Sequence, residues 1–232
     1  MPKHHKEKEE TASIDGDIFK LASIGDLDKL TEIVEGGHGV DEVDGMGCTP
    51  LVWAARNNMV KCVTFLLEKG AAAGFAGYGG MAALHHTANN MHEASLVALL
   101  DAGADANQAD DGGNTAMHLN ASRGVMAIAI ILKDKGADVN AANKAGATPL
   151  MKSCVNGQLT CAQKLLQLGA DVSLADSSGD TALHFAARGG FGALCKLLMG
   201  EGKADATAAN AAGETASQVA AQAASGAFSA ES

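Results

Sequence analysis

Short stripes of apolar residues recur along the chain between polar segments. One stripe has a spacing that places its members on one face of a helix: Val60, Val63, Leu66 and Leu67. A glycine recurs at the point where each such helix would end, at Gly70, Gly103, Gly136 and Gly169. Polar segments such as residues 110–114 then follow and are typical of turns. The pattern therefore predicts short helices joined by polar turns.

A motif repeats along the chain at an almost constant interval. Its copies begin at positions 49, 82, 115, 148, 181 and 215, so the interval is constant except for one extra position before the last copy. Thr49 and Thr148 are suited to cap a helix, and Pro50 and Pro149 follow at the first helical position, where a missing N–H is tolerated. Because one unit cannot bury its apolar stripe alone, we expect the units to stack on one another.

The interval of about 33 residues and the motif typified by Thr181-Ala182-Leu183-His184 make the chain similar to the ankyrin repeat family. The resemblance covers residues 15–224 and implies an all-α ankyrin-repeat solenoid of helix-turn-helix units with β-hairpin-like turns. We expect disordered tails at 1–12 and 225–232 around a repeat domain at 13–224. The expected units are an N-cap at 13–43, five repeats at 44–76, 77–109, 110–142, 143–175 and 176–209, and a C-cap at 210–224.

Composition and charge narrow the classes of partner. The 232 residues carry 17 basic and 27 acidic side chains, a net charge of -10, which repels phosphate backbones and argues against a nucleic-acid partner. No apolar segment approaches the roughly 20 residues that span a bilayer, so membrane insertion is not expected. The segment 1–11 is rich in Lys, His and Glu without an apolar stretch, unlike a secretory signal. We therefore expect a protein of the cytoplasm or the nucleus with reduced cysteines.

The residues that could carry chemistry favour structural roles. His85, His118 and His184 occupy one position per unit, about 8–10 Å apart, so each is expected to bond a neighbouring turn rather than share a metal. Cys62, Cys161 and Cys195 are expected to face inward, whereas Cys48 lies on a turn and is the thiol expected to react. The Gly-rich segment 77–80 lacks the following Lys-Ser/Thr pair of a phosphate-binding loop, so we do not expect such a loop there. We expect no catalytic site, no metal and no cofactor.

The family resemblance implies a concave binding face made by the turn tips and the outer positions of each first helix. Trp53 and Tyr78 are the only Trp and Tyr of the chain, and these residue types often dominate binding energy. The residues carried over to this face are Met46, Trp53, Arg56, Asn57, Tyr78, His86, Asn89, Asn90, Asp111, Asn114, Arg123, Lys152 and Arg188.

The expected function is a non-catalytic interaction module or adaptor that binds a protein partner and is a monomer by itself. The alternative is a structural subunit or an assembly chaperone of a large complex, cytoskeletal or proteasome-related and gankyrin-like. A third class, an enzyme or a small-ligand-binding protein, would need a pocket of convergent polar groups, which the sequence does not indicate.

The second full repeat and the turn around Asn140 each lead to a further prediction. In the second full repeat Ala82 replaces the capping Thr and Gly77 replaces the usual acid, so residues 70–82 should open first. Around Asn140 the turn resembles an asparagine-hydroxylation pattern, but the same residues also match the family consensus for a turn, which is the interpretation we favour.

Overall fold

A computed structural model describes residues 17–229, which belong to two compact units divided after Asp105. Within the described residues, unit 1 contains six α-helices and one short 3-10 helix. They are α2 (Ile18–Ile24), α3 (Leu27–Glu35), α4 (Pro50–Arg56), α5 (Val60–Glu68), η1 (Tyr78–Gly80), α6 (Ala83–Asn90) and α7 (Glu93–Asp101). The expected tail at 1–12 lies outside the described residues.

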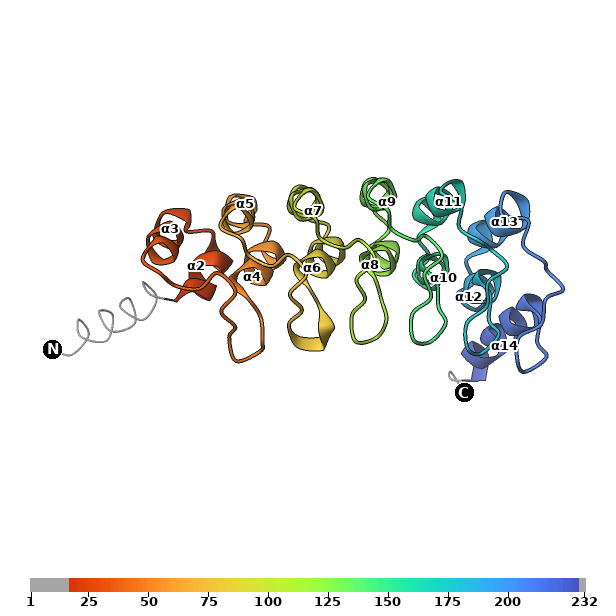
Figure 1. Cartoon of the computed structure of the whole chain (residues 1–232). Helices are drawn as coiled ribbons and strands as arrows, with labels where there is room; N and C mark the ends of the chain where they lie inside the picture. The colour runs from red at the N-terminus through yellow and green to blue at the C-terminus, as the bar shows by residue number, and fades with distance from the viewer. Residues whose placement is uncertain (1–16, 230–232) are drawn as a thin grey trace. The chain divides into compact units, whose positions relative to one another are not determined.

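Unit 1 is built from helix pairs in two rows. The first helices of the pairs form one row, in which α2 packs against α4 and α4 against α6. The second helices form the other row, in which α3 packs against α5 and α5 against α7 (Figure 1). The largest buried side chains between the rows are leucines: Leu21, Leu30, Leu51, Leu66, Leu84, Leu96 and Leu99.

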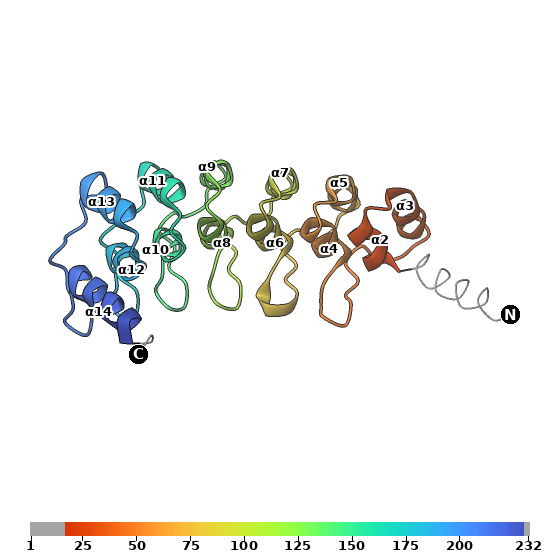
Figure 2. The same cartoon turned by 180° about the vertical axis from the view of Figure 1, so that it is seen from behind.

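Unit 2 continues the same pairing with seven described helices. They are α8 (Ala116–Arg123), α9 (Met126–Asp134), α10 (Pro149–Val155), α11 (Leu159–Gln167), α12 (Ala182–Arg188), α13 (Gly192–Gly200) and α14 (Ala216–Ser229). Helices α8, α10, α12 and α14 pack in order in one row, and α9, α11 and α13 in the other (Figure 2). The structure thus has the all-α repeat architecture that the sequence predicts.

Helix α14 differs from its prediction in length. It ends at Ser229, beyond the expected end of the repeat domain at residue 224. Alanine is the strongest helix former and is frequent from residue 220 to residue 224, which explains why the helix continues instead of giving way to a tail there. The remainder of the expected tail, residues 230–232, lies outside the described part.

The predicted start and stop signals of the helices operate as expected. The Thr49 side chain accepts a hydrogen bond from Val52 N (3.3 Å), and Pro50 is the first helical residue. Thr148 repeats this arrangement before α10, with Met151 N as donor (3.4 Å). The glycines that follow the second helices have φ between 87° and 95°, a left-handed conformation that a side chain disfavours: Gly70, Gly103, Gly136 and Gly169.

The turns before the first helices are narrow and hairpin-like. Isolated antiparallel bridges close three of them: Ala76 with Ala82, Ala175 with Thr181, and Ala209 with Thr215. These turns project from the row of first helices in each unit (Figures 1 and 2). We call residues 44–48 and 77–81 the first and second tips of unit 1, and residues 110–114, 143–147, 176–180 and 210–214 the tips of unit 2.

Candidate protein-binding face

Trp53 is held rigidly at the first tip of unit 1. Its Nε1 donates a hydrogen bond to Asp44 Oδ2 (2.8 Å), while Asp44 Oδ1 accepts from Met46 N (2.8 Å) and Cys48 N (2.9 Å). The Arg56 guanidinium lies 5.2 Å from the centre of the indole ring, within the range of a cation–π contact. Trp53 is half-buried and Arg56 is exposed, so the pair presents a pre-organised aromatic and cationic surface.

Asp44 remains ionised because of the same contacts. Partial burial works to raise its pKa, but the hydrogen bonds from Cys48 N, from Trp53 and from Met46 N outweigh this effect and hold the pKa below its usual value. The carboxylate therefore orients the indole at any ordinary pH. Asp44 was not among the predicted site residues, although its place before Thr49 matches that of Asp110 before Thr115 and could have identified it.

The two tips of unit 1 carry exposed apolar side chains. Tyr78 is 82% exposed and Met46 is 49% exposed, and Val43 and Phe75 flank the tips with 50% and 36% of their surface exposed. The tips lie against each other, since a Cβ atom at Gly77 would be only 2.7 Å from Cys48 Sγ. Two adjacent turns therefore display four large apolar side chains to solvent, which is unusual for a surface without a binding role.

Other predicted residues of unit 1 already have partners within the unit. The Asn57 amide donates to Ser23 O (3.1 Å) and Ser23 Oγ (2.7 Å). Asn90 Nδ2 donates to Arg56 O (3.0 Å), and Asn89 Nδ2 donates to Asn90 Oδ1 (3.1 Å). The amides of Asn57 and Asn90 connect the ends of neighbouring first helices, so their observed contacts serve the packing of the repeats.

His86 lies half-buried on the same helix row. Burial lowers its pKa to about 4, and the positive charge of Arg56 and the neighbouring His85 add to this effect. The imidazole is therefore neutral near pH 7. Next to Arg56 it supplies a polar but uncharged ring to the face.

The tips of unit 2 are linked by polar side chains. Asn143 Nδ2 donates to Asn114 Oδ1 (2.8 Å), and Asn210 Nδ2 donates to Asp180 Oδ1 (2.9 Å). Among the remaining predicted residues of this unit, Asp111 and Arg123 are exposed, and Lys152 is half-buried. The side chain of Asn114 is thus engaged within the unit, which the sequence pattern did not reveal.

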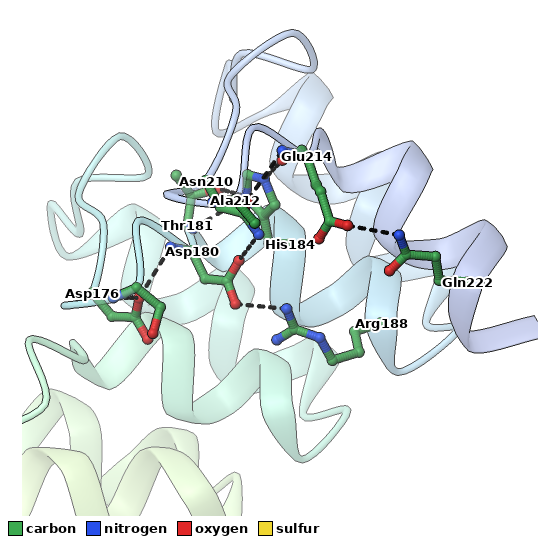
Figure 3. A network of polar contacts seen from close by, with 10 residues as sticks. Asp176, Asp180, Thr181, His184, Arg188, Asn210, Ala212, Glu214 and Gln222 are labelled. Carbon is green, nitrogen blue, oxygen red and sulfur yellow. Dashed lines mark hydrogen bonds and ion pairs between the residues drawn. The ribbon is translucent and has the colours of Figure 1, made fainter. Parts of the chain in front are cut away.

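Arg188 belongs to a closed polar network (Figure 3). Its guanidinium donates to Asp180 Oδ2 (2.6 Å) and lies 5.5 Å from the centre of the Phe185 ring. Burial favours a higher pKa for Asp180, but the hydrogen bonds from Asn210 and Arg188 reverse this, so its pKa is lowered. Figure 3 shows these side chains pointing toward one another between the last two tips, so the predicted site residue Arg188 is committed to an internal ion pair.

The histidines confirm the structural interpretation. His118 Nδ1 accepts from Thr115 N (3.1 Å), so its Nε2 is the donor toward Ala147 O (3.0 Å). His184 makes the equivalent contacts with Thr181 N (3.2 Å) and Glu214 O (3.0 Å). Each imidazole thus ties its own helix to the following tip. Within residues 17–229, no group of three or more His, Cys, Asp or Glu side chains could hold a metal ion.

The prediction about the cysteines is wrong at two positions. Cys48 was expected to be the reactive thiol, but it is only 5% exposed because it fills the space beside Gly77. Cys195 was expected to face inward, but it is half-buried, while Cys62, Cys154 and Cys161 are buried. The exposure of a thiol depends on the neighbouring repeat, and a repeat motif read alone does not contain that information.

Asn140 also has a structural role. Its Nδ2 donates to Gly169 O (3.2 Å), and its Oδ1 accepts from Asp171 N (2.8 Å). Asn107 makes the same pair of contacts one repeat earlier, with Gly136 O (2.9 Å) and Asp138 N (2.7 Å). These contacts explain the recurrence of Asn in this turn without a modification.

Comparison with known proteins identifies the family of the chain. The family model described as "Ankyrin repeats (3 copies)" matches residues 18–110 and 84–176. A second model, "Ankyrin repeats (many copies)", matches residues 154–199. The chain therefore belongs to the ankyrin repeat family, whose members are generally protein–protein interaction modules. No helix in the described part of the chain is long and apolar enough to cross a bilayer.

Two crystal structures resemble the chain over most of its length. The ankyrin repeat domain of human ASB11 is 27% identical, with a TM-score of 0.79 over 89% of this chain and 95% of that one. The ankyrin repeat domain of Bcl-3, described as a unique member of the IkappaB protein family, is 29% identical, with a TM-score of 0.79 over 88% and 94% of the two chains.

Two curated relatives match over shorter segments. The putative palmitoyltransferase ZDHHC13 of Danio rerio is 35% identical over 71 residues, or 31% of this chain. The DNA-binding protein RFXANK of Homo sapiens is 44% identical over 55 residues, or 23% of this chain. The matches span only 11% and 21% of those two proteins.

Proposed function

We propose that this protein is a non-catalytic interaction module of the cytoplasm or the nucleus that binds one protein partner through the tips and first helices of unit 1. The observation that carries the proposal is the group of exposed apolar side chains on two adjacent tips beside Trp53. Large aromatic side chains that are already held in place lose little conformational entropy on binding. This face therefore has the composition of a binding hot spot.

The proposed partner carries an apolar side chain and an acidic group close together. The apolar group would pack on Tyr78 and Met46, which are exposed, and the acidic group would pair with Arg56. Arg56 has no carboxylate partner among the described residues, whereas Arg188 is paired with Asp180. The net charge of -10 adds long-range repulsion toward nucleic acids, which supports a protein partner instead.

The absence of catalysis is also part of the proposal. Both ring nitrogens of His118 and of His184 are used in hydrogen bonds to backbone or threonine groups. A general base needs a free ring nitrogen within reach of its substrate. These histidines hold the repeats together and leave no such nitrogen.

Truncation of the anchor residues tests the proposed face. Trp53→Ala and Tyr78→Ala should each weaken partner binding by about 2 kcal/mol, or roughly thirtyfold in Kd, as expected for hot-spot residues. Arg56→Ala should mainly slow association. Lys133→Ala, an exposed substitution on α9, is the control and should leave the Kd unchanged. The Kd is measured by isothermal calorimetry with the partner recovered by stoichiometric pull-down.

The outcome of the pull-down also separates the functional alternatives. One stoichiometric partner or a small set of partners supports an adaptor. Recovery of one large particle favours the structural or assembly-chaperone role. If Lys133→Ala weakens binding as much as Trp53→Ala, the assignment of the face to unit 1 is wrong.

A further inference from the structure

Backbone hydrogen bonds join consecutive tips of unit 2. In each pair of neighbouring tips, the second residue of the later tip donates its N–H to the carbonyl oxygen of the third residue of the earlier one. The bonds are Lys144 N to Gly112 O (3.0 Å), Ser177 N to Ala145 O (2.9 Å) and Ala211 N to Ser178 O (2.9 Å). These donors and acceptors are thus used within unit 2.

The equivalent bond is missing between the two tips of unit 1. Tyr78 N would be the donor and Met46 O the acceptor, but among the described residues neither atom has a backbone hydrogen-bond partner. Apart from its chain neighbours, a Cβ atom at Gly47 would meet no atom within 4 Å, whereas one at the equivalent Gly146 would lie 2.8 Å from the nitrogen of the next tip. The outer ends of the two tips are therefore apart, although the tips touch at Gly77.

The sequence explains why the second tip of unit 1 differs. In each other tip of the described residues, the first residue is Asp or Asn, and its Oδ1 accepts from the N–H groups of the third and fifth residues: Asp44, Asp110, Asn143, Asp176 and Asn210. Gly77 has no such acceptor. The second tip instead forms the turn η1, in which Gly79 has a left-handed φ of 70° that the third residue of no other described tip adopts.

We propose that the N–H of Tyr78 and the carbonyl of Met46 bind the backbone of an extended segment of the protein partner. In an extended chain the N–H and C=O of one residue point to the same edge, so one partner residue can pair with both groups. Addition of such a segment obtains affinity from main-chain bonds and specificity from the side chains beside them. The inference rests on the function proposed above and adds that the bound segment is extended.

The side chains around these groups define the chemistry of the segment. Met46 and Tyr78 are exposed and would cover an aliphatic side chain. Arg56, which is exposed beside Trp53, would pair with an acidic residue of the segment. The residue that donates to Met46 O is not proline, because proline has no N–H. The expected segment therefore carries aliphatic and acidic residues in short succession.

Other occupants fit less well. Ile14 is the large aliphatic residue of the N-terminal segment nearest to Asp17, and three residues span at most about 10 Å. Asp17 precedes α2, whereas Tyr78 precedes α6, two helices further along a row of first helices packed about 8–10 Å apart. Ile14 therefore does not reach Tyr78. A second copy carries the same net charge of -10, which opposes self-association.

Amide exchange in the chain alone tests whether the donor is free. Solvent-exchange NMR should show the Tyr78 N–H exchanging almost as fast as in an unfolded chain, and the N–H groups of Lys144 and Ser177 at least about 100-fold more slowly. Equal protection of all three would overturn the proposal. Protection of Tyr78 that rises with protein concentration would overturn it in favour of a second copy.

A closed variant keeps the exposed side chains and pairs the free backbone groups. It is Cys48→Ala/Gly77→Asp/Gly79→Ser, which copies the residues at the same positions of unit 2: Ala147, Asp176 and Ser178. The new carboxylate supplies the acceptor that the second tip lacks, and the Tyr78 N–H should then exchange as slowly as that of Ser177. Cys48→Ala alone is the matched control, because it leaves the glycines of the second tip in place.

Peptides selected on the full-length chain from a phage-displayed library of random sequences of about 12 residues provide the probe. The best peptide should bind the parent chain and Cys48→Ala with a Kd of about 10 μM, as measured by fluorescence anisotropy, and the closed variant at least about tenfold more weakly. Circular dichroism verifies that both variants fold.

Replacement of single peptide amides by esters gives a readout that needs no change in the protein. The ester that removes the donor to Met46 O should weaken binding about tenfold, while esters at positions without a backbone contact should have little effect. Bound peptide should also slow exchange of the Tyr78 N–H at least about tenfold.

The outcomes separate this inference from the function on which it rests. If Trp53→Ala weakens peptide binding but the closed variant and the esters do not, the partner contacts side chains only, and the inference is wrong while the proposed face stands. If none of these changes weakens binding, both are wrong. Failure to select any peptide on the parent chain would also overturn the inference.

Discussion

Equivalent tips in the two units are joined by different chemistry. In unit 1 the contact between tips is the sulfur of Cys48 against the backbone at Gly77, and the apolar side chains around it are exposed. In unit 2, two of the residue pairs at the same two positions, Asn114 with Asn143 and Asp180 with Asn210, are joined by hydrogen bonds of 2.8 and 2.9 Å, and the pair between them is Ala147 with Asp176.

The different links between tips suggest that some tips stabilise the stack of repeats while others are available to bind a partner. Polar side chains that bond one another across tips stabilise the stack but have fewer groups left for a partner. The tips of unit 1 lack such a link at Gly77, and Tyr78 next to it is 82% exposed. The local stability of unit 1 should therefore be lower and its capacity to bind a partner higher.

Removal of the carboxylate at the last polar link should have the largest effect on stability. Asp180→Ala removes the acceptor of Arg188 and Asn210 at a position that is 5% exposed, so we expect a loss of about 2 kcal/mol in the free energy of unfolding. Urea denaturation followed by circular dichroism measures this loss. Asp111→Ala, at an exposed position of another tip, is the control and should change the free energy by less than about 0.5 kcal/mol.

The pH dependence of the same variant tests the cause. Because the pKa of Asp180 is lower in the folded protein than its ordinary value of 3.8, its ionised form stabilises the fold fully above that value. This contribution is lost as the pH falls below 3.8 through the folded pKa. The parent protein should therefore lose more stability than Asp180→Ala as the pH falls below about 4, and parallel pH profiles would contradict the assignment.

Introduction of an Asn–Asn hydrogen bond between the tips of unit 1 should have the next largest effect on the free energy of unfolding. Gly77→Asn alone should destabilise the protein by about 1.5 kcal/mol, because its Cβ would lie 2.7 Å from Cys48 Sγ and 3.3 Å from the backbone of Gly47 and Cys48. Adding Cys48→Asn removes the sulfur and recreates the pair found at Asn114 and Asn143. The double variant should regain about 1 kcal/mol in urea denaturation. If the two substitutions are simply additive, the tips are not equivalent in the way we describe.

Restoration of the missing N-cap of α6 should have the smallest effect on the free energy of unfolding. Ala82 has no side-chain acceptor, whereas Thr49 and Thr148 cap the equivalent helices. Ala82→Thr should therefore stabilise the protein by about 1 kcal/mol. Before substitution, amide hydrogen exchange should be faster at residues 70–82 than in the other internal turns, and Ala82→Thr should slow it selectively. Equal exchange in all turns of the parent protein would refute this weak link.

Much of the fold follows from local sequence signals. Thr and Pro at the helix starts and Gly after the second helices specify conformation through their own backbone and side-chain chemistry. The repeats, the starts of α4 and α10, and the stops after α5, α7, α9 and α11 could therefore be predicted. The end of α14 was missed because the predicted boundary followed the repeat period, whereas alanine propensity extends the helix to Ser229.

The candidate site was only partly predictable. The sequence pattern predicts one face for Trp53, Arg56 and Tyr78, and the structure shows the contact between Trp53 and Arg56. The contact of Trp53 with Asp44 and that of Arg188 with Asp180 depend on distances between a helix and its preceding turn, which the repeat pattern does not specify. The contacts of Asn57 and Asn114 with neighbouring repeats were missed for the same reason.

The repeat family, the alternation of helices and turns, and the residue type at each repeat position follow from the sequence alone. Which of these side chains remain available depends on how the repeats pack. Cys48 is buried and Cys195 is half-buried because burial depends on the next repeat. In the described residues, that repeat presents a glycine to Cys48 and no covering second helix to Cys195. Conformation along a repeat is set by residues a few positions apart, whereas exposure is set by atoms of the next repeat in the chain, which become neighbours only when the repeats stack.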